Sequence, residues 1–171
     1  YGVTASNVSL TNLVSNSGVV AADVSGVGTA RQGLSALGYG GDKAIFGYGT
    51  TGSRVSLTNL VNNSGVVAAD VTGVGTARNE LAGASYGGDK GIFGYGTSGS
   101  GRVSITNLVS NLGVVATDTT GVGSARRFPS AASYGGDKAI FGYGNTGSNT
   151  AITNLVNNSG VVAADVSGVG T

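Results

Sequence analysis

The stretch Tyr39-Gly40-Gly41-Asp42-Lys43-Ala44-Ile45-Phe46-Gly47-Tyr48-Gly49 occurs three times in this chain of 171 residues. It returns at residues 86–96 and 134–144 with one internal change, where the second copy has Gly91 in place of Ala44. The copies begin 47 and then 48 residues apart. Near-identical repeats at this period are typical of propellers and related arrays, in which each repeat is one supersecondary unit.

The composition favours short strands joined by tight turns. The chain is 40% hydrophobic, mostly Val and Ala, and it has 33 Gly, 1 Pro and no Trp. Val packs well on a pleated, half-buried surface, and Gly supplies the positive φ angles that turns need. No long window has the 3.6-residue apolar period of an amphipathic helix, so an all-β fold is expected.

Charge and missing residue types exclude several classes of function. Nine Lys and Arg against eight Asp and Glu give a net charge of +1, which predicts no binding to nucleic acid or to an anionic membrane surface. No Cys and no His are present, so disulfides, thiolate metal sites and the commonest general base are lacking. We predict no enzyme activity, no cofactor, no metal site and no insertion into a membrane, since no apolar run is long enough to span one.

Each repeat divides into four predicted strands. In the second unit they cover residues 81–86, 90–95, 103–109 and 114–118, bounded by Gly, Asn and Ser. Four antiparallel strands linked by hairpins make one propeller blade, so the predicted fold is a β-propeller present as a partial array, with a β-solenoid as the alternative. The predicted units are a half blade at 1–29 and three blades at 30–76, 77–124 and 125–171.

The repeats resemble those of the kelch family of propellers. Arg78, the run Asp89–Gly96, the run Asn107–Val109 and the run Gly113–Val115 are similar to the kelch pattern from its Arg through its third and fourth strands. They also resemble kelch-like arrays in bacteriophage tail-associated proteins. That resemblance implies a protein of a virion tail or fibre or of a cell surface, placed outside the cell and bound to a host glycan or protein.

Three and a half blades do not make a ring, which needs at least four. Further blades in a longer native chain, or closure through copies of the same protein, are therefore expected, since unpaired sheet edges invite association. The chain also has no Met and begins in mid-repeat with Tyr1-Gly2, which is equivalent to Tyr48-Gly49. It is accordingly expected to be a processed product or a fragment.

The repeated side chains are assigned a structural role, because a catalytic site needs one unsymmetrical arrangement and these residues recur in every unit. We expect Asp70 to bond with Arg78 and Asp118 with Arg126, so that each Asp reaches the next Ala-Arg segment of the chain. Phe93 and its equivalents are expected to lie in the core between blades. The equivalents of Tyr95 are expected either in the core or with a hydroxyl group at the surface.

The units differ in two segments, the residues after each Ala-Arg pair and the connection between the second and third strands. Because neighbouring strands alternate in direction, both segments are expected on one face of the array, here called the variable face. Loops on a rigid scaffold are common binding sites. The predicted binding residues are Arg127, Phe128, Arg54, Arg102, Asn79, Glu80 and Asn149.

Two functions remain open from the sequence. In one, the variable face binds a glycan or a protein, with Arg127 and Phe128 as the side chains that depart most from the repeat. In the other, the near-identical blades serve assembly alone, without a ligand. Packing of Phe128 against the neighbouring loop is the structural alternative to a binding role for that ring.

Overall fold

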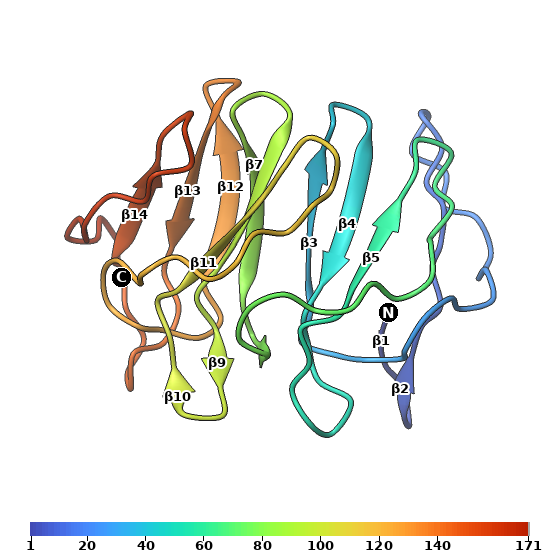
Figure 1. Cartoon of the computed structure of the whole chain (residues 1–171), viewed down its shortest axis with the longest axis horizontal. Coiled ribbons are helices and arrows are strands. Elements are labelled where there is room, and N and C mark those ends of the chain that lie inside the picture. The colour runs from blue at the N-terminus through green and yellow to red at the C-terminus, as the bar shows by residue number, and fades with distance from the viewer. Residues whose placement is uncertain (171) are drawn as a thin grey trace.

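The computed structural model describes residues 1–170. This part of the chain is all-β and consists of small antiparallel sheets set side by side without closing into a ring. Figure 1 shows the N-terminal strands at one end of the row and the C-terminal strands at the other. Among the described residues, no helix has the length and apolar character needed to cross a membrane.

Each of the three full units contains one main sheet of three antiparallel strands. Their bounds are β3 Ser35–Tyr39, β4 Lys43–Gly47 and β5 Thr58–Val61; β7 Ala82–Tyr86, β8 Lys90–Gly94 and β11 Thr106–Val109; and β12 Ser130–Tyr134, β13 Lys138–Gly142 and β14 Thr153–Val156. Five short strands complete the set: β1 Gly2–Val3, β2 Asn7–Val8, β6 Arg78–Asn79, β9 Thr97–Ser98 and β10 Gly101–Arg102.

The predicted fourth strand of each unit forms only two bridges to the third strand. In the second unit these bridges are Thr106 to Thr119 and Val109 to Val115, so the outer segment holds one residue more than β11 between them. That extra residue makes a bulge. The Asn107 side-chain amide donates to the Ala116 carbonyl, 3.0 Å away, in the bulged part. The prediction of a regular strand at 114–118 is therefore wrong, although the segment lies where it was expected.

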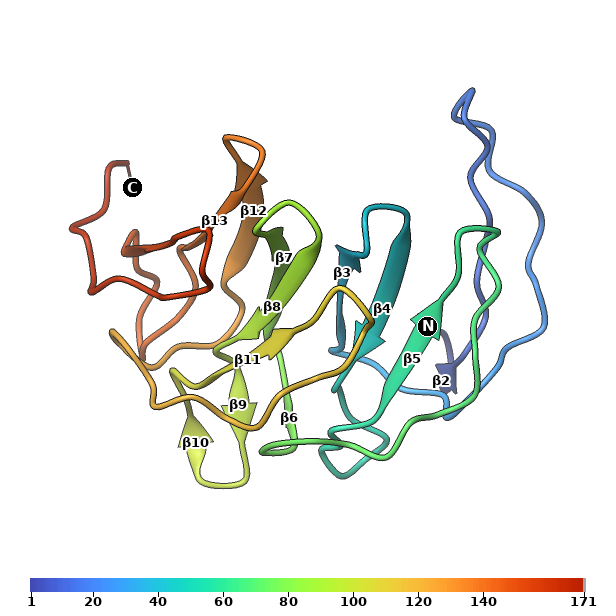
Figure 2. The same cartoon turned by 45° about the horizontal axis from the view of Figure 1, so that its top comes forward.

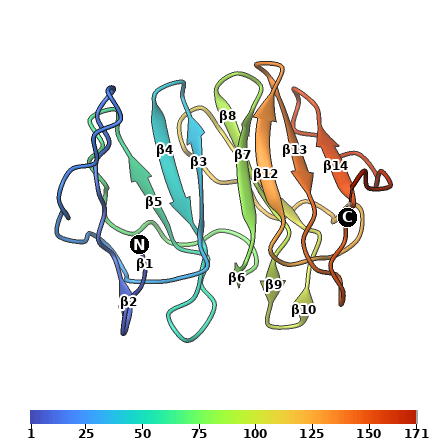
Figure 3. The same ribbon diagram turned by 180° about the vertical axis from the view of Figure 1, so that it is seen from behind.

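The first strands of the three units lie next to one another, with β7 between β3 and β12. Figures 2 and 3 show the sheets following one another in this order from two further directions. The turns between first and second strands lie at one end of the sheets, and the β9–β10 hairpin lies at the other. The connections between strands therefore lie on two opposite faces of the row of sheets.

The core fills the spaces between successive sheets. Phe93 and Phe141 are fully buried, which confirms their predicted place in the core. A Cβ atom added at Gly47 would lie 2.7 Å from the Phe93 ring, and one added at Gly94 would lie 2.7 Å from the Phe141 ring. Gly47 and Gly94, the glycines of the first two Phe-Gly pairs, thus make room for the phenylalanine of the following unit.

Candidate functional site

The two variable segments of each unit lie together, as the sequence predicts. Strand β6, which begins at the Arg of the Ala-Arg pair, is hydrogen-bonded to β9, which follows the second strand of the same unit. The same contact is a single bridge between Gln32 and Thr50 in the first unit and between Arg127 and Asn145 in the third. The segments of the variable face therefore lie side by side, at the end of the sheets opposite the Gly-Gly turns (Figure 1).

Side chains of the variable face connect one unit to the next. The Arg54 Nε donates to Asn79 Oδ1 at 3.0 Å, and the Arg102 Nη2 donates to Asn145 Oδ1 at 3.1 Å. The Asn145 Nδ2 in turn donates to Asn149 Oδ1 at 3.3 Å. Four of the predicted binding residues thus take part in bonds that cross or border the junctions.

Each Ala-Arg pair is followed by a turn, and Glu80 in the turn of the second unit contacts Arg127 and Phe128 in the turn of the third. Glu80 Oε2 accepts a bond from the Thr97 hydroxyl at 2.8 Å and lies 3.9 Å from Arg127 Nη1. The Phe128 amide donates to the Glu80 carbonyl at 2.8 Å, and the Glu80 amide donates to the Gly33 carbonyl at 2.9 Å. The structure therefore brings all seven predicted residues into one connected surface over three units.

The turn residue has positive φ in every unit, at 61° for Gly33, 59° for Glu80 and 53° for Phe128. Only glycine takes this conformation without steric cost, and a bulky residue there is an outlier. Phe128 is nevertheless 58% exposed, and its ring centroid lies 5.2 Å from the Arg127 guanidinium carbon. A strained, exposed aromatic residue is a candidate for function.

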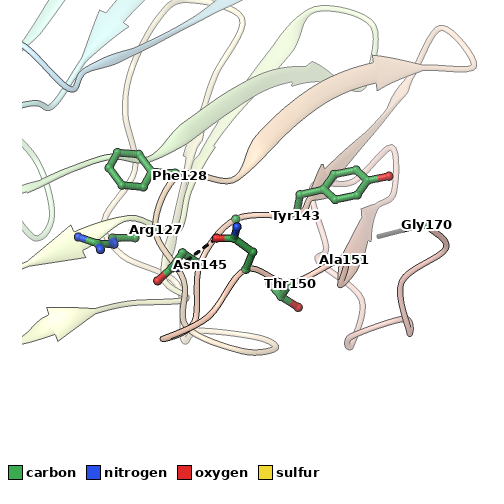
Figure 4. Close-up of a pocket in the computed structure, with 9 residues that line it drawn as sticks. Arg127, Phe128, Tyr143, Asn145, Thr150, Ala151 and Gly170 are labelled. Atoms are coloured by element: carbon green, nitrogen blue, oxygen red, sulfur yellow. Dashed lines mark hydrogen bonds between the residues drawn. The ribbon is translucent and has the colours of Figure 1, made fainter.

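An open hollow of about 740 Å³ lies beside this ring. Figure 4 shows Phe128 and Arg127 on one side of the hollow, Asn145 and Thr150 in the middle, and Tyr143 on the other side. Sequence reasoning missed Tyr143, Asn145 and Thr150 as lining residues. Asn145 and Thr150 belong to a connection already recognised as variable, whereas Tyr143 is identical in every unit and gave no such signal.

A second set of contacts is repeated at each junction and centres on a buried arginine. Arg31, Arg78 and Arg126 are fully buried. Their guanidinium carbons lie over the rings of Tyr1, Tyr48 and Tyr95 at 4.6, 4.1 and 3.9 Å from the ring centroids. A guanidinium over an aromatic ring is attracted by the negative face of that ring.

Hydrogen bonds to its own unit and to Thr29, two residues before it, complete the site of Arg31. Arg31 donates from Nε to the Tyr48 carbonyl at 2.8 Å, from Nη2 to Asn59 Oδ1 at 2.6 Å, and from Nη1 to the Thr29 carbonyl at 3.1 Å. Arg78 repeats the first bond at 2.9 Å to the Tyr95 carbonyl. A buried charge needs such partners, since an unpaired one is costly.

The acidic partner of each arginine differs from the prediction. Asp70 lies 3.8 Å from Arg31 and Asp118 lies 4.0 Å from Arg78, so each Asp pairs with the arginine that opens its own unit. The predicted pairs Asp70 with Arg78 and Asp118 with Arg126 are wrong. The bulged outer segment runs antiparallel to the third strand, which returns its Asp to the point where the chain enters the unit.

The repeated carboxylates are fixed by several donors. Asp118 accepts bonds from the Thr76 amide and hydroxyl, and from the Asn107 amide at 2.9 Å. Burial alone would raise the pKa of Asp118, but these bonds and the charge of Arg78 outweigh it and hold the pKa below its ordinary value. Burial raises the pKa of Tyr48 and Tyr95, although the neighbouring guanidinium groups oppose this. The tyrosines beneath the arginines therefore stay neutral.

Within residues 1–170, no group of three or more Asp or Glu side chains is placed to hold a metal ion. Comparison of the chain with models of known protein families gives no match, and comparison with curated proteins gives none. The case for function therefore rests on the two sets of contacts described above, the variable face and the repeated arginine site.

Proposed function

We propose that this chain is a non-enzymatic recognition protein of a virion tail or fibre, or of a cell surface, that binds a host glycan through its variable face. In this proposal each three-stranded sheet with its bridged outer segment is one blade of a partial, kelch-like β-propeller. The antiparallel pairing of all three strands within each unit supports blades over the β-solenoid, whose coils pair in parallel.

The observation that carries the proposal is the hollow beside Phe128. An exposed ring, the Arg127 guanidinium and the Asn145 and Asn149 amides border a single concave surface. Carbohydrate ligands have apolar ring faces that stack on aromatic side chains and hydroxyl groups that bond with planar polar side chains. Phe128 also has a positive φ, a strained conformation of the kind that clusters at functional sites.

The experiment replaces Arg127 and Phe128 together with the residues of the preceding unit, giving Arg127→Asn/Phe128→Glu. The second unit already holds Asn79 and Glu80 at these positions with nearly the same φ at Glu80, so the variant is expected to fold. Binding to a panel of immobilised glycans should be lost. The matched control is Lys138→Gln, which changes an exposed charge in the Gly-Gly-Asp-Lys turn at the opposite face.

Three results decide the proposal. Glycan binding that survives in the correctly folded double variant would remove the variable face from consideration. Binding to a protein on the host surface, but to no glycan, would keep the face and change the ligand class. The absence of any binding by the unaltered chain would favour the second candidate function, an architectural array that serves assembly alone.

A specific observation supports that second candidate. The buried arginine site recurs at three successive junctions, and each copy links one unit to the next through a ring contact. Several of the variable side chains also bond across the junctions, as Arg54 does with Asn79. These contacts strengthen the array whether or not it binds a ligand.

A further inference from the structure

The charged side chains of the two faces are paired differently. On the face of the Gly-Gly-Asp-Lys turns, each lysine lies beside the aspartate of its own turn, at N–O distances of 3.0, 3.1 and 2.8 Å. On the variable face, Arg54 and Arg102 are exposed, and within residues 1–170 neither forms an ion pair with Asp or Glu. The first face is therefore neutral, whereas the second presents two positive charges without a carboxylate partner.

Both arginines are held in place by uncharged partners in the next unit. Arg54 Nε donates to Asn79 Oδ1 at 3.0 Å, and Arg102 Nη2 donates to Asn145 Oδ1 at 3.1 Å. An amide oxygen fixes the position of a guanidinium group but does not cancel its charge, as a carboxylate would. The remaining nitrogens of these two groups bond with no other residue in the part of the chain that the structure describes. They keep the N–H donors that bind a carboxylate or sulfate group.

The rest of the variable face does not compensate these two charges. Glu80, its one acidic residue among those predicted to bind, lies 3.9 Å from Arg127 Nη1 and so is already paired. Three arginines against one glutamate give the predicted binding residues a net charge of +2. That value exceeds the net charge of +1 for the whole chain, so the excess positive charge is concentrated on this face.

Arg54 also lines a second hollow, between the first and second full units. This hollow has a volume of about 450 Å³ and is separate from the one beside the exposed phenylalanine ring. Both units have further units on their other side, so it is internal to the array. Its polar side chains are those of Arg54, Asn79, Thr50 and Ser53, and its lining includes no Asp, no Glu and no apolar side chain larger than that of Ala77.

We infer that the glycan bound by the variable face is acidic, and that Arg54 and Arg102 bind anionic groups on one sugar chain. The inference rests on the proposed function and specifies the class of its ligand. Each guanidinium group donates hydrogen bonds to the oxygens of a carboxylate or sulfate group. In the second hollow, the Thr50 and Ser53 side chains add hydroxyl groups that can bond with the hydroxyl groups of the same sugar.

The spacing of the two arginines favours a sugar chain over a nucleic acid. They occupy equivalent positions in successive units, at the start of Arg54-Val55-Ser56 and Arg102-Val103-Ser104. Neighbouring sheets pack about 10 Å apart, so the two charges are separated by roughly that distance. Duplex DNA carries one charge per about 1.7 Å, and single strands are bound by stacking on aromatic rings, which the second hollow lacks. A polysaccharide with one acidic group in each repeating unit has the sparser charges that two arginines can match.

The test compares acidic polysaccharides with neutral ones of the same backbone, using the whole chain immobilised on a sensor surface. Polygalacturonate is paired with its methyl ester, and dextran sulfate with dextran, so that the two pairs distinguish a carboxylate from a sulfate ligand. At least one acidic polysaccharide should bind at least about ten-fold more tightly than its neutral counterpart. Raising the NaCl concentration from about 0.02 M to about 0.3 M should weaken that binding at least about three-fold, because salt screens exposed charges.

Two double variants assign the effect to the arginines. Arg54→Asn/Arg102→Asn introduces the residue that the third unit already has at this position, Asn149, so the variant is expected to fold. It should bind the acidic polysaccharide at least about ten-fold more weakly. The matched control is Lys43→Gln/Lys90→Gln, which lowers the net charge by the same two units on the opposite face and should bind as the wild type does.

The outcomes separate this inference from the proposed function. Neutral glycans that bind as tightly as acidic ones would overturn the inference and leave the proposed function standing. Acidic binding that survives in the arginine variant, or that falls equally in the lysine control, would also overturn it. Binding that is lost in the arginine variant but kept in Arg127→Asn/Phe128→Glu would support it and remove the hollow beside Phe128 from the binding site. The absence of binding to any glycan, acidic or neutral, would overturn both proposals.

Discussion

Replacing Gly91 with Ala is expected to destabilise the protein because the side chain of Leu37 fills the space that the new methyl group would need. A Cβ atom built at Gly91 lies 2.2 Å from Leu37 Cδ1, whereas ordinary van der Waals contact begins at 3.4 Å. Leu37 is 6% exposed and lies in the core cluster with Ile45 and Phe93, so it has little room to move. Overpacking of this kind costs about 1–3 kcal/mol.

The same geometry predicts that a second substitution compensates for the first. Leu37→Ala alone should cost about 2–5 kcal/mol, the usual range for a buried leucine. In Leu37→Ala/Gly91→Ala the new methyl group enters the space that the leucine leaves, so the double variant should be more stable than the sum of the single losses by at least ~1 kcal/mol. The junction between the second and third units already has this combination, since Ala84 and Ala139 are both buried in one cluster.

Urea denaturation of the wild type, both single variants and the double variant measures this coupling energy. Midpoints should shift without a change in the dependence of the unfolding free energy on urea concentration. Ala139→Gly is the matched control, since it removes a methyl group that fits and should cost about 1 kcal/mol. Single losses that add to within about 0.5 kcal/mol of the double loss would refute the reasoning, and so would a neutral Gly91→Ala.

Two further predictions concern the junctions and the repeated carboxylate. Gly47→Ala should cost about 1–3 kcal/mol in thermal or urea unfolding, because its Cβ would meet the Phe93 ring at 2.7 Å, whereas Gly142→Ala, 3.4 Å from Thr153, should change stability by less than ~1 kcal/mol; equal losses would contradict the packing account. Asp118→Ala should cost about 1–3 kcal/mol at neutral pH. Because the pKa of Asp118 is lowered in the folded protein, this stabilisation is fully present above the unfolded pKa of about 3.9 and is lost as the pH falls through the folded pKa. The stability difference between wild type and variant should therefore shrink below about pH 4, and a difference that does not depend on pH would contradict the assignment.

Much of the arrangement could be predicted from the repeat. The recurring motif placed the first two strands of the second unit within one residue of their observed ends, at residues 81–86 against Ala82–Tyr86 and 90–95 against Lys90–Gly94. Alternation of strand direction placed both variable segments on one face, where β6 and β9 are paired. These features follow from local sequence pattern and turn chemistry, and the same pattern occurs in every repeat.

The sequence alone determined the period, the strand pairs and the membership of the variable face. Only the tertiary structure decided which Asp meets which Arg, because Asp70 is near Arg78 in sequence but meets Arg31 through the return of its own sheet. It also decided that the Tyr48 ring lies beneath the Arg78 guanidinium, 30 residues further along the chain. Contacts between distant segments depend on how whole sheets stack, and local sequence patterns do not specify that stacking.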